Sequence, residues 1–212
     1  MRLNLYKRGL RVLAIAESFR RNGDRSILAG VVMRADCKID GIGVDSATVG
    51  GLDATEGVLR IFYKLGRRDI NLILLNGAVI SWFNIIDIDR VYALLGLPLI
   101  SLTYEPSEGL ERYIKEYFGD SEDYNERVSR YRSLGDRSEV MLKSGHRVWV
   151  RTAGITEKDA AVILNRFTSH GRIPEPIKIA KLIARSILDL KQEWEEVTST
   201  ESLRRSASRM RS

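Results

Sequence analysis

Residues 11–44 read RVLAIAESFRRNGDRSILAGVVMRADCKIDGIGV, and this stretch decides the fold. It holds three β-like runs, over 11–18, 26–34 and 37–44, and the first of them ends in an acid. A two-residue turn at 35–36 separates the second run from the third. Because turns this short join antiparallel neighbours, the sequence predicts three antiparallel strands at the start of the chain.

Further along, the hydrophobic spacing changes to that of strands alternating with helices. Apolar residues recur at helical spacing over 53–65, and 70–75 (INLILL) is apolar throughout, as expected of a strand covered on both faces. A helix over 84–95, a strand over 98–103 and a helix over 107–118 are expected next. This alternation predicts parallel strands joined by helical crossovers.

The last third of the chain is less regular. We expect a charged helix over 122–134, a half-buried strand over 146–151 and a helix over 156–168. A long helix then runs from the segment Ile173-Pro-Glu-Pro176 to about Glu196.

The end of the chain, 198–212, is rich in Ser and Arg and poor in apolar residues, so a basic, disordered tail is expected. In the absence of a repeat or linker, 1–197 is predicted to form a single domain. The predicted fold is α/β, a ribonuclease H-like mixed sheet of three antiparallel strands and then parallel strands, with flanking helices. A doubly wound flavodoxin-like fold is the alternative, and the opening hairpins argue against it.

Composition narrows the classes of function. The apolar stretch 70–86 is interrupted by amides that a membrane span would leave in hydrocarbon, and the N-terminus lacks the apolar run of a signal peptide. The single cysteine, Cys37, is read as a packing residue beside a strand and fits a reducing, cytoplasmic setting. A net charge of +6 favours an anionic partner such as nucleic acid, with solubility alone as the alternative.

Four polar residues fall where the carboxyl ends of the predicted parallel strands would meet: Glu17, Asp53, Glu56 and Asn76. Converging oxygen ligands attract Mg²⁺ or Mn²⁺, and such ions assist phosphodiester cleavage. Each residue also has an explanation in local structure. Asp53 and Glu56 have the spacing of a capping box, and Glu17 can be a charged residue at the end of a strand. Asn76 precedes Gly77, a pair that is typical of a turn. Spacing alone therefore leaves a metal site and local structure as alternatives.

Several longer motifs resemble a known family. They are Thr48-Val-Gly-Gly-Leu-Asp-Ala-Thr-Glu56, Leu75-Asn-Gly77 with Trp82-Phe-Asn-Ile-Ile-Asp87, Gly96-Leu-Pro-Leu99, and Arg172-Ile-Pro-Glu-Pro176 with Ala180-Lys-Leu-Ile-Ala184. Through them the chain from about Arg11 to Leu188 resembles the archaeal endonuclease dU-like family, formerly an uncharacterised domain family, which is similar to endonuclease V. The resemblance implies a ribonuclease H-like fold and Mg²⁺-dependent cleavage of DNA near a deaminated base.

The resemblance also places the family's acids, and two of them are altered here. The family's Ile-Asp-Asp corresponds to Ile15-Ala-Glu17, and its Leu-Asp-Gly to Leu75-Asn-Gly77, while the helix-start acid falls at Glu56. An asparagine offers a carbonyl oxygen but has lost a negative charge and cannot act as a base. We therefore expect weak metal binding and impaired catalysis.

The predicted function is a metal-dependent endonuclease acting on DNA, with RNA as the alternative substrate. Glu17, Glu56 and Asp53 are the expected catalytic residues, and Glu17 and Glu56 together with Asn76 the expected metal ligands.

Trp82 and Phe83 are expected to stack on a flipped base and Arg172 to bind phosphate, with core packing as the alternative for the two aromatics. A non-catalytic nucleic-acid-binding protein that retains the nuclease fold is the main alternative function, and an unrelated interaction protein or small-molecule enzyme a third. No partner protein is identifiable, and no membrane association is expected.

Overall fold

The structure, a computed structural model, describes residues 3–209, apart from the side chains of 195–197 and 199–209. The strands of its main sheet are β1 (Arg11–Ser18), β2 (Arg25–Arg34), β3 (Ile39–Thr48), β4 (Leu72–Asn76), β7 (Leu99–Thr103), β8 (Ser138–Met141) and β9 (Arg147–Ala153). A separate hairpin is formed by β5 (Val79–Ile80) and β6 (Asn84–Ile85). The helices are α1 (Ala54–Leu65), α2 (Ile88–Leu95), α3 (Glu111–Phe118), α4 (Tyr124–Ser133), α5 (Glu157–Phe167) and α6 (Glu175–Arg209).

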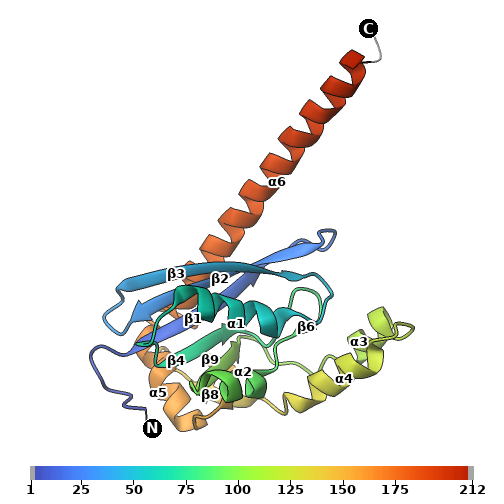
Figure 1. The fold of residues 1–212 in the computed structure, drawn as a ribbon. Helices are drawn as coiled ribbons and strands as arrows, with labels where there is room; N and C mark the ends of the chain where they lie inside the picture. The colour runs from blue at the N-terminus through green and yellow to red at the C-terminus, as the bar shows by residue number, and fades with distance from the viewer. Residues whose placement is uncertain (1–2, 210–212) are drawn as a thin grey trace.

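Within the described residues, seven strands form one sheet in the order β3-β2-β1-β4-β7-β9-β8 (Figure 1). Strands β1, β2 and β3 are antiparallel neighbours, and β1, β4 and β7 are parallel. This arrangement confirms the predicted mixed sheet and is incompatible with the flavodoxin-like alternative, whose strands are all parallel. Strand β9 extends the sheet antiparallel to β7, and β8, which the sequence did not predict, closes that edge.

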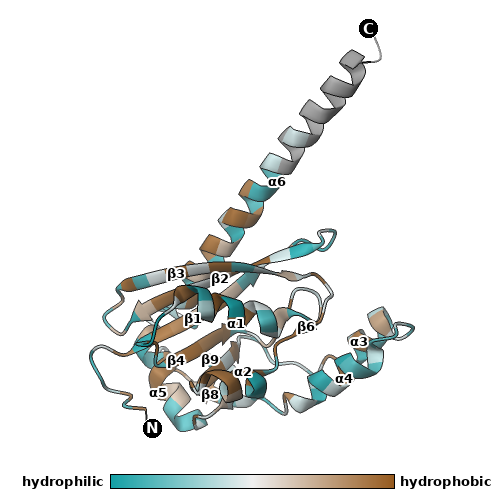
Figure 2. Cartoon of the chain, in the orientation of Figure 1, coloured by the Kyte–Doolittle hydropathy of each residue, from teal (hydrophilic) through white to brown (hydrophobic). Residues whose placement is uncertain are grey.

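The central strands are buried on both faces. In β4, Ile73 and Leu75 pack in a hydrophobic cluster with α1 and α2, while Leu72 and Leu74 pack in a second cluster with α5 and α6. Alternate residues of a strand point to opposite faces, so a strand between two helical layers must be apolar at every position. The brown strands in the middle of Figure 2 show this arrangement, and the charged helix α4 is largely teal.

The elements differ from the prediction mainly at their ends. Helix α2 begins at Ile88 rather than 84, because Asp87 caps it by accepting a hydrogen bond from the Arg90 N–H (2.9 Å), and the residues before it form β6. At α5, Thr156 caps the helix expected over 156–168, since its hydroxyl accepts from the Asp159 N–H (3.2 Å).

Cys37 lies in the turn between β2 and β3. It is exposed and has a positive φ of 62°, so its interpretation as a packing residue is wrong. The Arg34 N–H donates to the Lys38 carbonyl (2.9 Å), which closes a turn over 35–37 in place of the predicted two-residue turn. A left-handed residue at the third position is the usual way to close such a turn on right-twisted strands.

Helix α6 passes the expected end at about Glu196 and continues unbroken to Arg209, so the predicted end of this helix is too early. The sequence after Pro176 contains neither Pro nor Gly, and therefore nothing in it forces the helix to end. Figure 1 shows the far half of α6 extending away from the sheet. The division into a domain over 1–197 and a tail stays a prediction, and 210–212 lie outside the described residues. Within 3–209, the helices all lack the combined length and apolar character needed to cross a membrane.

Helix α1 approaches the outer strands closely because glycine occupies facing positions. Gly30 of β2 is paired with Gly43 of β3, and a Cβ built on Gly30 would lie 2.6 Å from Cγ2 of Ile61 on α1. A Cβ on Gly41, in the same sheet region, would instead lie 3.5 Å from the nearest atom, which is ordinary van der Waals contact.

We predict that Gly30→Ala lowers the free energy of unfolding by about 1 to 3 kcal/mol, because the added methyl group overpacks the contact with Ile61. Gly41→Ala is the matched control and is expected to be near neutral. Urea unfolding of the two variants measures the difference; equal stability of both would contradict the packing argument.

Candidate functional site

The predicted site lies where β1 and β4 end. Glu17 is the second-last residue of β1, and Asn76 is the last residue of β4. The turn between β5 and β6 reaches the end of β1, since the Ser81 N–H donates to Oε1 of Glu17 (3.5 Å). Three separate elements therefore meet at this edge of the sheet, as expected for a site at the carboxyl ends of parallel strands.

Glu17 is a carboxyl group without a full set of partners. Its Oε2 atom is shielded from solvent and has no hydrogen-bond partner among the described residues. Burial raises the pKa of Glu17, although the Ser81 N–H and the positive charge of Lys181 on α6 act in the opposite direction. Burying a carboxyl oxygen without a hydrogen-bond partner lowers the stability of the folded state, and such groups concentrate at functional sites.

Asn76 and Tyr104 present two further unsatisfied atoms. Oδ1 of Asn76 and the hydroxyl of Tyr104 are buried without a partner in the described part of the chain. Asn76 pairs with Leu102 on β7, so Tyr104, two residues beyond Leu102, lies on the same face of the sheet. Burial raises the pKa of Tyr104, with Arg172 opposing the shift. These atoms form a polar corner at the sheet edge.

The pairing register of β1 with β4 shows to which face of the sheet the altered residues point. Ile15 pairs with Leu75, so Ala16 and Asn76, the next residue of each strand, point to the same face. Ala16 packs in the cluster with α6, whereas Ile15 packs in the cluster with α1. The two departures from the family's acidic motifs, Ala16 and Asn76, are therefore neighbours on one face, and Glu17 is directed toward the other.

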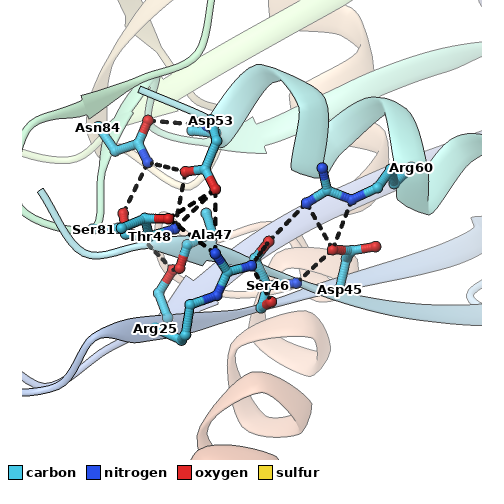
Figure 3. A network of polar contacts seen from close by, with 11 residues as sticks. Arg25, Asp45, Ser46, Ala47, Thr48, Asp53, Arg60, Ser81 and Asn84 are labelled. Atoms are coloured by element: carbon cyan, nitrogen blue, oxygen red, sulfur yellow. Dashed lines mark hydrogen bonds and ion pairs between the residues drawn. The ribbon is translucent and has the colours of Figure 1, made fainter. Parts of the chain in front are cut away.

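Asp53 is the centre of a hydrogen-bond network (Figure 3). Its carboxylate accepts from the N–H (2.9 Å) and hydroxyl (3.0 Å) of Thr48, from Nδ2 of Asn84 (2.8 Å) and from Nη1 of Arg25 (3.4 Å). Burial alone would raise the pKa of Asp53, but the bonds from Thr48 and Asn84 outweigh it and lower the pKa. The capping-box interpretation is wrong for Asp53, because its side chain makes no cap hydrogen bond to the first turn of α1. The first N–H of the helix, that of Ala54, instead donates to Oδ1 of Asn84 (2.9 Å).

Glu56 is engaged in a surface ion pair. Its Oε1 accepts from Nη1 of Arg90 at 2.7 Å, and both side chains are partly exposed. Among the described residues, no three His, Cys, Asp or Glu side chains gather in a group that could hold a metal ion. The free oxygens of Glu17 and Asn76 are of the type that Mg²⁺ takes, but two ligands with one charge make a weak site.

Trp82 and Phe83 belong to an aromatic cluster above this edge. With Ser81 they form three consecutive non-glycine residues with positive φ, at 44°, 62° and 63°. The Trp82 ring lies 4.7 Å from Tyr117, and the guanidinium of Arg21 lies 3.9 Å from the Trp82 ring centre. Both aromatics are half-buried, an intermediate between the base-stacking and core-packing alternatives.

Arg127 holds this cluster in place, a role that was not predicted from the sequence. We expected a solvated helix there, but the residue is 3% exposed. Its guanidinium donates to the carbonyls of Gly50 (2.5 Å) and Phe83 (3.4 Å), pairs with Asp123 (2.6 Å) and lies 3.9 Å from the ring centre of Phe118. The only sequence signal is the i,i+4 spacing from Asp123, which is also usual on exposed helices.

Arg172 is held at the end of β7. Its guanidinium donates to the Tyr104 carbonyl (2.8 Å) and to the Glu105 carboxylate (2.6 Å). The residue therefore connects the start of α6 to β7, and its expected role in phosphate binding stays a proposal.

Comparison with known proteins places the chain in a family. The family model described as Endonuclease dU matches residues 8–188. The protein belongs to the endonuclease dU family. A UPF0215 protein of Pyrobaculum calidifontis is 38% identical over 176 residues, which cover 82% of this chain and 95% of that relative.

Two solved structures share the fold. A protein of unknown function from Archaeoglobus fulgidus superposes with a TM-score of 0.73 at 25% identity, covering 84% of this chain and 98% of that one. Endonuclease V of Ciona intestinalis, in complex with DNA containing an inosine, gives a TM-score of 0.57 at 17% identity, covering 85% and 86%. These matches confirm the predicted ribonuclease H-like, endonuclease V-like fold.

For this family member, we predict that Asp53→Ala lowers the free energy of unfolding by about 2 to 3 kcal/mol, because the donors of Thr48 and Asn84 lose their acceptor. Glu56→Ala, in the first turn of the same helix, removes only an exposed ion pair and should cost about 0 to 1 kcal/mol.

Since the folded-state pKa of Asp53 is lowered, its contribution is present above the unfolded pKa and is lost as the pH falls through the folded pKa. The difference between wild type and Asp53→Ala should therefore shrink in acid. Chemical unfolding at several pH values tests this expectation, and a difference independent of pH would contradict it.

Glu17→Gln should have the opposite pH dependence. The pKa of Glu17 is raised in the folded state, so wild-type stability falls as the pH rises from the unfolded pKa to the folded pKa. The neutral variant avoids this loss, and its stability relative to wild type should be greater at pH 7 than at pH 4. Urea unfolding at both pH values measures the change; the same difference at each would show that the carboxyl is not destabilised by burial.

Proposed function

We propose that this endonuclease dU family member binds DNA containing a deaminated base and cleaves it weakly. The observation that carries the proposal is the pair of buried oxygens without partners, on Glu17 and Asn76, at the carboxyl ends of two parallel strands. Groups left unsatisfied in this position are expected to meet a ligand.

Glu17 and Asn76 point to opposite faces of the sheet, so an ion that both hold would lie beyond the ends of β1 and β4, and Glu56 would join them after it leaves Arg90. Mg²⁺ or Mn²⁺ held there would supply the Lewis acid of phosphodiester cleavage. Asp53 would act by fixing the start of α1, and with it Glu56, rather than by contacting substrate, because its oxygens are occupied. The positive charge of Lys181 near Glu17 further reduces the attraction for a metal ion. Catalysis is impaired for these reasons.

The aromatic cluster is the proposed contact for the base. The Ser81 N–H bonds Glu17, and Trp82 and Phe83 are the next two residues of the same turn. A base flipped out of the stack is recognised by stacking of this kind, and Arg21 over Trp82 adds a cation for the adjacent phosphate. A cytoplasmic setting is part of the proposal, because the one cysteine is a free thiol.

A non-catalytic nucleic-acid-binding protein is the second candidate. The observation that favours it is the juxtaposition of Ala16 and Asn76, which removes two acids from one face of the site. Both candidates predict nucleic-acid binding that weakens steeply with salt. They differ in whether the bound strand is cut.

Cleavage of labelled DNA carrying one deoxyuridine or deoxyinosine, with Mg²⁺ or Mn²⁺, separates the candidates. We expect slow cutting by wild type, none by Glu56→Ala, and cutting by Asn76→Asp that is about 10- to 100-fold faster, because a carboxylate ligand is restored. Asn125→Asp, which adds the same charge on the exposed surface of α4, is the control.

Binding without cutting by wild type, and without a gain in Asn76→Asp, would favour the non-catalytic candidate. Absence of binding to any of the DNA substrates at moderate salt would contradict both.

A further inference from the structure

A second polar cavity opens beside the site, at the end of β7. Its volume is about 640 Å³, and it lies between the loop after β7, the end of α4 and the outer face of β9. Arg137, Arg151, Trp149 and Tyr131 line it. Cavities of this size take ligands of the size of a nucleotide.

Arg137 is fixed in the lining of this cavity. Its Nη1 donates to the hydroxyl of Thr103 (2.8 Å) and to the Glu105 carbonyl (3.0 Å), and its Nη2 donates to the Ser107 carbonyl (3.4 Å). All three acceptors are neutral, so these bonds orient the guanidinium without neutralising its charge.

Arg151 faces the same cavity from β9. Its Nε donates to the Gly135 carbonyl (2.9 Å), and the residue is half-buried. Burial lowers the pKa of Arg151, and the charge of Arg137 adds to the effect while Tyr131 and Asp136 oppose it. Within residues 3–209, neither Arg137 nor Arg151 has a carboxylate partner within ion-pair distance, which is an unfavourable state for two neighbouring cations unless an anion joins them.

Acidic residues line the same cavity but lie at its exposed rim. Glu111 is paired with Arg132 (2.8 Å), and Glu108 and Asp136 are exposed to solvent. Their charges are screened by water, whereas the two guanidiniums are partly shielded from it. An anion entering the cavity therefore meets two cations with fixed donors.

The cavity lies at the same end of the sheet as the first site, on the face to which Glu17 points. Arg137 bonds Thr103, which shares a face of β7 with Leu99 and therefore lies on the α1 side of the sheet, whereas Asn76 pairs with Leu102 and points to the other side. Trp149 pairs with Thr103 across β7 and β9, which places its ring at the same end of the sheet.

We propose that this cavity binds the phosphate of a nucleotide between Arg137 and Arg151, with the base against Trp149. The inference rests on the proposed function in taking that nucleotide to be part of the nucleic-acid strand whose deaminated base lies against Trp82 and Phe83. A free mononucleotide carries the same phosphate chemistry, and the experiment distinguishes the two sources.

The experiment measures binding of a fluorescent single-stranded oligodeoxynucleotide containing deoxyuridine, and separately of deoxyuridine monophosphate, to the full chain. Arg151→Gln should weaken oligonucleotide binding by about 10-fold and reduce the salt slope by about 1, and Arg151→Lys should retain part of the affinity. Arg34→Gln, which removes a cation paired with Asp36 (2.7 Å) at the opposite end of the strands and outside the cavity, is the matched control and should bind like wild type. Thermal unfolding of each variant shows that it is folded.

Loss of oligonucleotide binding in Arg151→Gln but not in Arg34→Gln supports the proposal. If wild type binds only the mononucleotide and Arg151→Gln loses it, the phosphate site stands and the proposed nucleic-acid function fails. If the oligonucleotide binds wild type and folded Arg151→Gln equally, the proposal is overturned while the proposed function stands. Binding of neither ligand to wild type overturns both.

Discussion

The Asp53 carboxylate accepts the hydrogen bonds that hold together the elements at the carboxyl ends of β1 and β4. Thr48 ends β3, Asn84 belongs to the β5–β6 hairpin, and Asp53 itself precedes α1. A single carboxylate therefore connects the end of β3 and the start of α1 to a hairpin that lies more than thirty residues further along the sequence. The 81–83 turn can lie over Glu17 only because Asn84, the next residue, is held in this way, and Glu56 is placed by the same start of α1.

Around this anchor the fold tolerates features that oppose stability. Three successive non-glycine residues with positive φ cost about 1 to 3 kcal/mol each, and the shielded carboxyl of Glu17 adds a further penalty. Arg127, buried against the same turn, and the Asp53 bonds supply the contacts that offset these costs. Local strain of this kind, enclosed by a rigid frame, is typical of segments that a ligand must approach.

The strands and helices that depend on hydrophobic periodicity could be predicted from the sequence. The roles of side chains that depend on contacts between distant segments could not. The alternation in 11–44 and the continuous apolar run of β4 are local patterns, and both predictions are confirmed. Asp53 has the spacing of a cap, but Asn84 on a different element takes that role. Arg127 has the spacing of a surface pair, yet it is buried by loops far from it in sequence. The family motifs identified the positions of the acids, and only the strand register shows that Ala16 and Asn76 share a face.

The chain's sole thiol offers a practical route to following its behaviour. Cys37 is exposed in the β2–β3 turn, at the opposite end of the strands from Glu17. Eight residues of strand separate the two ends, a span of about 25 Å at the usual rise per residue. A maleimide dye or spin label therefore attaches at one defined position without mutagenesis, far enough from the site to leave it undisturbed and near enough for energy transfer to a labelled oligonucleotide.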